Sequence, residues 1–235
     1  MRRLSTALLL LLALFVTARA QDAGAWMSKP YSQWTMKEVE ALLSESPWAR
    51  TIARNAGMVN VGTNPTMMSD KVYTLRLRSA LPIRHGLLRL RQLREKYDQM
   101  DAKKKAEFDE KNRALVECPA CEENYVLALV PPKGDAHLGG LTAFKDAAFD
   151  KVKLYVQLTN DRGERRELVH FVPPKARGQE VVFFFPRLDA QGRPLFTPET
   201  RRLVFTVDPV LMGDTTITRF EIDVSKLVVD GKVIL

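Results

Sequence analysis

The chain has 235 residues, of which 46% are hydrophobic and 27% are charged, and it carries a net charge of +8. This composition is ordinary for a globular protein and excludes a collagen-like or low-complexity chain. The positive excess is moderate, so we expect no nucleic-acid partner and at most a preference for anionic groups.

The first twenty residues have the pattern of a secretory signal. Basic residues precede an apolar run over 4–16, and Ala18 and Ala20 are the small residues that signal peptidase requires. We therefore expect 1–20 to be a signal peptide, cleaved before Gln21, and the protein to be periplasmic or secreted. The apolar run over 4–16 is too short to span a bilayer comfortably, and no second long apolar run follows, so we expect no transmembrane segment after signal cleavage.

The region 21–122 begins with two predicted helices. Thr35 and Glu38 have the spacing of a capping box, which predicts a helix that starts just after Thr35. Ser46 and Pro47 are typical of a second helix start. We expect this short helix to end near Gly57 and to bury its apolar side chains, which are Trp48, Ala49 and Ile52.

One strand and a helical hairpin complete the region 21–122. Apolar and polar residues alternate over 73–78, as in a strand with one polar face. The pattern over 82–117 predicts a helical hairpin, in which Asp101 caps the second, strongly charged arm. The sequence therefore predicts an N-terminal helical layer with one strand.

Short strands are predicted through most of the region 123–235. The predicted strands are 125–130, 152–159, 167–172, 181–185, 203–207 and 220–224. Residues 141–149 are expected to form a short helix, and turns are expected at 160–163 and at Asp230-Gly231. We expect an antiparallel β-sandwich-like domain, which makes the fold class α+β.

Cys118 and Cys121 form a C-P-A-C motif and are the only cysteines of the chain. In an exported protein such a pair usually forms a disulfide. The alternative is a dithiol redox site, in which a helix N-terminus lowers the pKa of one thiol. Here the pair follows a predicted helix, whose C-terminal dipole raises the pKa instead. We therefore favour a structural disulfide that joins the helical region to the first strand of the sandwich.

Two groups of residues are candidates for a partner-binding surface. Arg84, Arg91 and Arg94 have helical spacing and could share a face that meets an anionic glycan or lipid. The alternative, which we favour, is a solvated face whose charges are paired with nearby acidic residues. Trp26 and Tyr31 could stack on sugar rings or dock a partner.

Motifs of the common catalytic and metal sites are not found in the sequence. The three histidines lack zinc-finger spacing, and Glu122 stands where haem attachment requires histidine. There is no Gly-x-Ser-x-Gly, P-loop, dinucleotide-binding or H-E-x-x-H motif. We therefore expect no catalytic residue, no cofactor and no bound metal.

The segment 29–49 contains W-T-x-x-E followed by S-P-W-A, and it resembles the opening of uncharacterised exported bacterial proteins, especially of acidobacteria-like lineages. Residues 79–84 and 170–175 are similar to the same group. The resemblance implies an exported bacterial protein and carries no known activity.

The function predicted from the sequence is that of an exported envelope protein, either a non-catalytic binding module or a structural one. Its expected partner is an envelope protein or a glycan. The alternatives are a thiol-disulfide oxidoreductase that uses the C-P-A-C pair and a hydrolase whose residues meet only in the fold.

Overall fold

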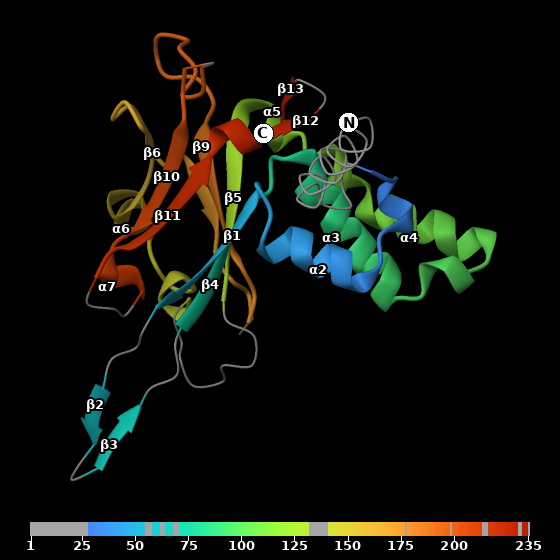
Figure 1. Cartoon of the computed structure of the whole chain (residues 1–235), viewed down its shortest axis with the longest axis horizontal. Helices are drawn as coiled ribbons and strands as arrows, with labels where there is room; N and C mark the ends of the chain where they lie inside the picture. The colour runs from blue at the N-terminus through green and yellow to red at the C-terminus, as the bar shows by residue number, and fades with distance from the viewer. Residues whose placement is uncertain are drawn as a thin grey trace, which may run out of the picture.

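Figure 1 shows the computed structural model of the chain. It describes residues 28–54, 58–61, 64–67, 71–131, 141–176, 178–197, 199–212, 216–229 and 232–234. The predicted signal peptide, Trp26, Gly57 and the predicted turn at Asp230-Gly231 lie outside the described residues.

The helices α2, α3 and α4 lie together on one side of the molecule (Figure 1). The helix α2 spans Met36–Ser44 and begins with the predicted capping box, in which the Thr35 side chain accepts a hydrogen bond from the Glu38 amide. The helices α3, Leu81–Arg94, and α4, Ala102–Glu117, form the predicted hairpin. The side chain of Asp101 caps α4 as predicted, by accepting a hydrogen bond from the Lys104 amide.

A five-stranded antiparallel sheet contains strands from both predicted regions. Its order is β1 (Ala49–Arg54), β4 (Lys71–Leu77), β5 (Asn124–Val130), β9 (Val181–Pro186) and β8 (His170–Val172). Leu75 of β4 is paired with Leu129 of β5. The strand predicted within the helical region is therefore a neighbour of the first strand of the predicted sandwich.

A four-stranded antiparallel sheet forms the second layer of the sandwich. Its order is β11 (Thr218–Asp223), β10 (Arg202–Val207), β6 (Val156–Asn160) and β7 (Arg165–Arg166). The ring of Phe205 on β10 lies 5.3 Å from that of Phe183 and 6.3 Å from that of Phe185, both on β9. One hydrophobic core contains side chains of both sheets and of α2 and α3. The structure thus has the predicted α+β fold.

Smaller elements connect the two sheets and the helices. They are η3 (Tyr31–Gln33), the hairpin of β2 (Met58–Val61) and β3 (Asn64–Met67), η4 (Tyr97–Gln99), α5 (Ala120–Glu123), η5 (Thr142–Phe144), α6 (Phe149–Tyr155), α7 (Pro209–Met212), η6 (Val224–Lys226), and the hairpin of β12 (Val228–Val229) and β13 (Lys232–Val233). Within the described part of the chain, no helix is both long and apolar enough to cross a membrane.

The helix predicted after Ser46 and Pro47 is wrong. Residues of this segment form β1, which pairs with β4 along its whole length. Trp48 and Ala49 are buried as predicted, but they lie at the start of a strand and not on the face of a helix. Pairing with a strand that lies later in the chain outweighs the local helix signal, because tertiary contacts routinely override local propensity.

Four further predictions in the region 123–235 need correction. Residues 149–155 form α6 rather than the start of a strand, and the predicted helix over 141–149 is limited to η5. Of the strand predicted over 167–172, only 170–172 form a strand, β8, which pairs with β9, whereas β7 ends at Arg166 and pairs with β6 in the other sheet. The predicted last strand ends at Asp223, and Val224 lies in η6. The chain therefore crosses between the sheets around Leu168, which is fully buried.

Candidate functional site

The predicted disulfide joins Cys118 and Cys121, with an S–S distance of 1.97 Å. Cys118 ends α4 in the left-handed conformation, and its amide donates to the carbonyl of Ala114 at 3.1 Å. Cys121 lies in α5, which leads directly into β5. The disulfide therefore sits where the helical hairpin is joined to the sandwich, as the sequence predicted.

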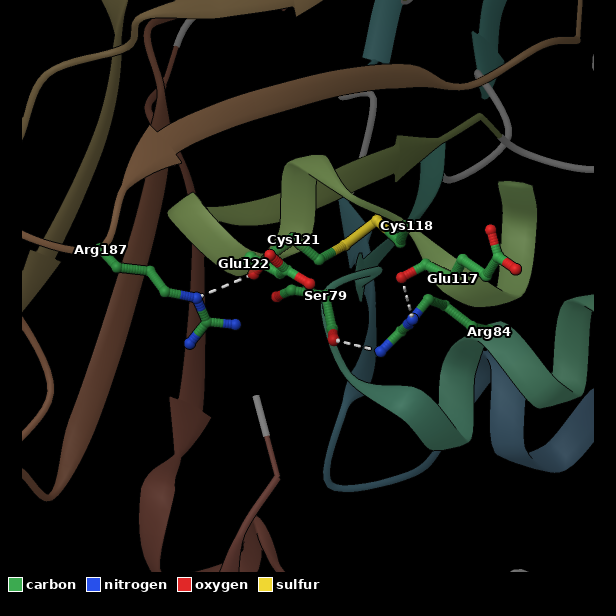
Figure 2. Close-up of a pocket in the computed structure, with 7 residues that line it drawn as sticks. All are labelled: Ser79, Arg84, Glu117, Cys118, Cys121, Glu122 and Arg187. Carbon is green, nitrogen blue, oxygen red and sulfur yellow. Dashed lines mark hydrogen bonds between the residues drawn. A yellow bond between two sulfur atoms is a disulfide. The ribbon is translucent and has the colours of Figure 1, made fainter. Parts of the chain in front are cut away.

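Two pockets adjoin this disulfide and share Arg84 and Cys118 in their walls. The polar pocket has a volume of about 390 Å³ and is lined by Ser79, Arg84, Glu117, Cys118, Cys121, Glu122 and Arg187 (Figure 2). The apolar pocket has a volume of about 210 Å³ and is lined by Arg78, Arg84, Ala114, Leu115, Cys118, Pro119, Ala120, Val126, Val182 and Phe184.

Arg84 links α3 to the end of α4. One guanidinium nitrogen donates to the main-chain carbonyls of Val116 and Glu117, the latter at 3.2 Å, and another donates to the carbonyl of Ser79 at 3.4 Å. The last carbonyls of a helix lack partners within the helix, and a cation there is also favoured by the helix dipole. The end of α4 thus holds Arg84 at the wall of the polar pocket.

Arg187 reaches the polar pocket from the end of β9, opposite Arg84 (Figure 2). Its Nε donates to the carbonyl of Cys121 at 2.9 Å, and its guanidinium carbon lies 5.0 Å from the centre of the Tyr125 ring. Burial lowers the pKa of Arg84, and the charge of Arg187 lowers it further. Burial also lowers the pKa of Arg187. Both guanidinium groups stay charged at neutral pH, because an arginine pKa starts far above it.

Ser79 lies between the two arginines in the polar pocket (Figure 2). It is 1% exposed, and its Oγ has no hydrogen-bond partner among the described residues. The buried Nε of Arg84 likewise has no partner there. Buried polar atoms are almost always hydrogen-bonded in folded proteins, so two such atoms in residues of one pocket require an explanation.

The floor of the apolar pocket is the outer face of the five-stranded sheet. Val126 of β5 and Val182 of β9 form a small buried cluster there with Cys121 and Ala128. Phe184 and Cys118 pack against this cluster. The disulfide segment therefore covers part of the outer face and leaves an apolar surface beside it.

Arg84 and Arg91 share one side of α3, because both donate hydrogen bonds to residues of α4. Arg84 lines both pockets, Arg91 donates to Oδ1 of Asn112 on α4 at 2.6 Å, and Arg94 is exposed near the end of α3. The ring of Tyr31 stacks on that of His85 at 4.4 Å, so it packs against α3. Among the described residues of the partner surface suggested by the sequence, only Arg84 lines the two pockets.

Sequence reasoning did not identify Ser79 or Arg187 as site residues. Each lies just after a strand, Ser79 after β4 and Arg187 after β9, and neither stands in a known catalytic or ligand-binding motif. The two strands flank β5, so their ends come together only in the folded sheet. Pairing of the strands was the missing information.

Neither a metal-binding cluster among the described residues nor a known relative points to a function for this site. In the part of the chain that the structure describes, no group of three or more His, Cys, Asp or Glu side chains could hold a metal ion. Comparisons with protein-family models, with curated proteins and with solved structures found no match.

Proposed function

We propose that this protein is an exported, non-catalytic binding module whose ligand site is the pair of pockets beside the disulfide. The observation that carries the proposal is the buried hydroxyl of Ser79, a residue that lines the polar pocket, because this hydroxyl has no hydrogen-bond partner among the described residues. A buried polar atom without a partner costs about 1–3 kcal/mol. A ligand with acceptor groups would remove this cost on binding.

The shape of the site also supports binding. Ligand sites are usually concave, with an apolar surface and a few polar groups that converge on it. The polar pocket supplies the polar groups, and the apolar pocket continues it along the outer face of the sheet. Both arginines are held by main-chain carbonyls, so the polar groups are positioned before a ligand arrives.

Export is supported by two features of the chain. The first twenty residues have the pattern of a secretory signal, and we propose that they are removed. The disulfide is of the kind that persists in the periplasm or outside the cell and is rare in the cytosol. The ligand would then be a component of the cell envelope.

Amide NMR shifts of the ¹⁵N-labelled protein test the location of the site. We expect small acidic, basic, sugar and aromatic probes to give shifts that cluster around Ser79, Arg84 and Cys118. Ala114→Trp should abolish these shifts, because Ala114 lines the apolar pocket. Ala106→Trp is the matched control, since Ala106 is also exposed on α4 but does not line either pocket. Shifts that are absent for every probe, or that survive Ala114→Trp, would contradict the proposal.

A thiol-disulfide oxidoreductase is the second candidate, because the disulfide lines both pockets and two guanidinium groups share the polar one. Nearby arginines lower the pKa of a thiol, whereas the C-terminal end of α4 raises it. Intact mass after alkylation, with and without glutathione, separates the two functions. A pair that glutathione leaves oxidised supports the binding module, and ready reduction with reductase activity lost in Cys118→Ser supports the enzyme.

A further inference from the structure

We infer that the two pockets bind the C-terminal residue of a polypeptide, with its carboxylate in the polar pocket and an apolar side chain in the adjoining one. This inference rests on the proposed binding function and names the class of ligand. Such a ligand requires a carboxylate site, an apolar site and acceptors for its last amide.

The polar pocket has the groups that a carboxylate needs. Two positively charged guanidinium groups, those of Arg84 and Arg187, line it from opposite sides. The Oγ of Ser79 and the Nε of Arg84 both have a proton to donate and no acceptor among the described residues. A carboxylate accepts several hydrogen bonds, and those donated by charged groups are about twice as strong as neutral ones. It would also reduce the repulsion between the two arginines.

The apolar pocket is the site for the apolar side chain of the ligand. Val126, Val182 and Phe184 line it on the sheet side, and Leu115 lines it on the α4 side. Its volume of about 210 Å³ exceeds that of one aliphatic side chain, and Arg84 stands in the walls of both pockets. The carboxylate and the apolar group of the ligand must therefore be close together, as they are in a C-terminal leucine, isoleucine, valine or phenylalanine.

Two exposed carboxylates distinguish a peptide from a simple fatty acid. Glu117 and Glu122 also line the polar pocket and would repel a ligand that carried only negative charge. A peptide has an amide N–H next to its terminal carboxylate, and a glutamate oxygen can accept that proton. The mixed charge of the pocket therefore favours a peptide C-terminus over an alkyl carboxylate.

The test is a set of NMR titrations of the full protein with four probes. They are acetyl-Ala-Ala-Leu with a free carboxylate, the same peptide as its C-terminal amide, acetyl-Ala-Ala-Gly with a free carboxylate, and hexanoate. We expect the first probe to bind at least tenfold more tightly than each of the others. Equal binding of the amide would overturn the carboxylate site, and equal binding of the glycine peptide would overturn the apolar site. Equal binding of hexanoate would overturn the peptide assignment.

Variants show whether the named donors are responsible. Ser79→Ala removes the hydroxyl with little change in volume and should lower the affinity for the first probe about tenfold. An unchanged affinity would contradict the inference. Arg84→Gln should lower this affinity at least as much. Arg94→Gln should leave the affinity unchanged, because Arg94 is an exposed residue of the same helix that does not line either pocket. If none of the four probes binds but other probes shift the pocket amides, this inference fails and the binding function stands. If no probe of either panel shifts those amides, both fail.

Discussion

The indole nitrogen of Trp48 donates a hydrogen bond to the main-chain carbonyl of Ile234 across 2.8 Å. Trp48 lies just before β1 and is 1% exposed, whereas Ile234 follows β13 near the end of the chain. The bond joins residues 186 positions apart and supplements the shared core. It ties the helical region and the sandwich into one structure, so we expect them to unfold together.

Replacing Trp48 tests this cooperativity. Trp48→Phe removes the indole N–H and part of a fully buried ring. We expect the free energy of unfolding to fall by about 1–3 kcal/mol, because the carbonyl of Ile234 loses a donor and a small cavity forms. Urea denaturation followed by circular dichroism and by tryptophan fluorescence should give coincident transitions at a lower midpoint. Two separate transitions would show that the regions unfold independently.

A pair of substitutions in the sandwich tests the corrected position of α6. Phe205 lies between the sheets and is 1% exposed, so Phe205→Ala should cost about 3–5 kcal/mol of stability. Leu154 is 72% exposed on α6, and Leu154→Ala should change stability by at most about 0.5 kcal/mol. Thermal or urea denaturation of both variants gives the comparison. A large loss in Leu154→Ala would favour the strand predicted from the alternating pattern.

The contact between α2 and α3 leaves no room for a side chain at Gly86. A Cβ at this position would lie 2.9 Å from Cδ2 of Leu42 and 3.3 Å from Cδ2 of Leu43, both buried. Alanine favours the helix by about 1 kcal/mol relative to glycine, but overpacking a core lowers the free energy of unfolding by about 1–3 kcal/mol. We expect Gly86→Ala to lower stability by about 1 kcal/mol.

A double-mutant cycle with Leu42→Ala checks the cause of that loss. Truncating Leu42 removes the atom that a Cβ at Gly86 would meet. The two substitutions together should therefore cost less than the sum of their separate effects. Additive effects would mean that the helices do not meet closely at Gly86.

The ion pair and capping box at the start of α2 predict a pH-dependent contribution to stability. A hydrogen bond from Lys29, together with those from Thr35, lowers the pKa of Glu38 from 4.5 to about 2. The folded protein therefore binds this proton less readily than the unfolded chain does. The stabilisation is complete above about pH 4.5 and is lost as the pH falls toward 2. Glu38→Gln should make stability less dependent on pH in this range.

Urea denaturation at several acidic pH values measures this effect. The wild-type protein should lose more stability on acidification than Glu38→Gln, while the variant should be the less stable of the two at neutral pH. Glu107→Gln, at an exposed position on α4, serves as the control and should retain the wild-type profile. Identical profiles for wild type and Glu38→Gln would contradict the assigned pKa.

Local chemistry along the chain was enough to predict several features of this protein. The capping box of Thr35 and Glu38, the cap at Asp101 and the strand that contains Tyr73 depend on residues within a few positions of one another. The disulfide was also predictable, since the chain has the pattern of an exported protein and contains just two cysteines, only three positions apart. Such features follow from sequence because their partners are neighbours along the chain.

Other features were decided by the tertiary structure alone. Residues 49–54 form a strand because β4 supplies their hydrogen-bond partners, and the strand predicted over 167–172 begins only at His170, because the chain there passes from the pairing of β7 with β6 to that of β8 with β9 in the other sheet. The polar pocket exists because the ends of β4 and β9 lie on either side of β5, which brings Ser79 and Arg187 together. Strand pairing joins segments distant in sequence, and no local pattern specifies which segments will meet.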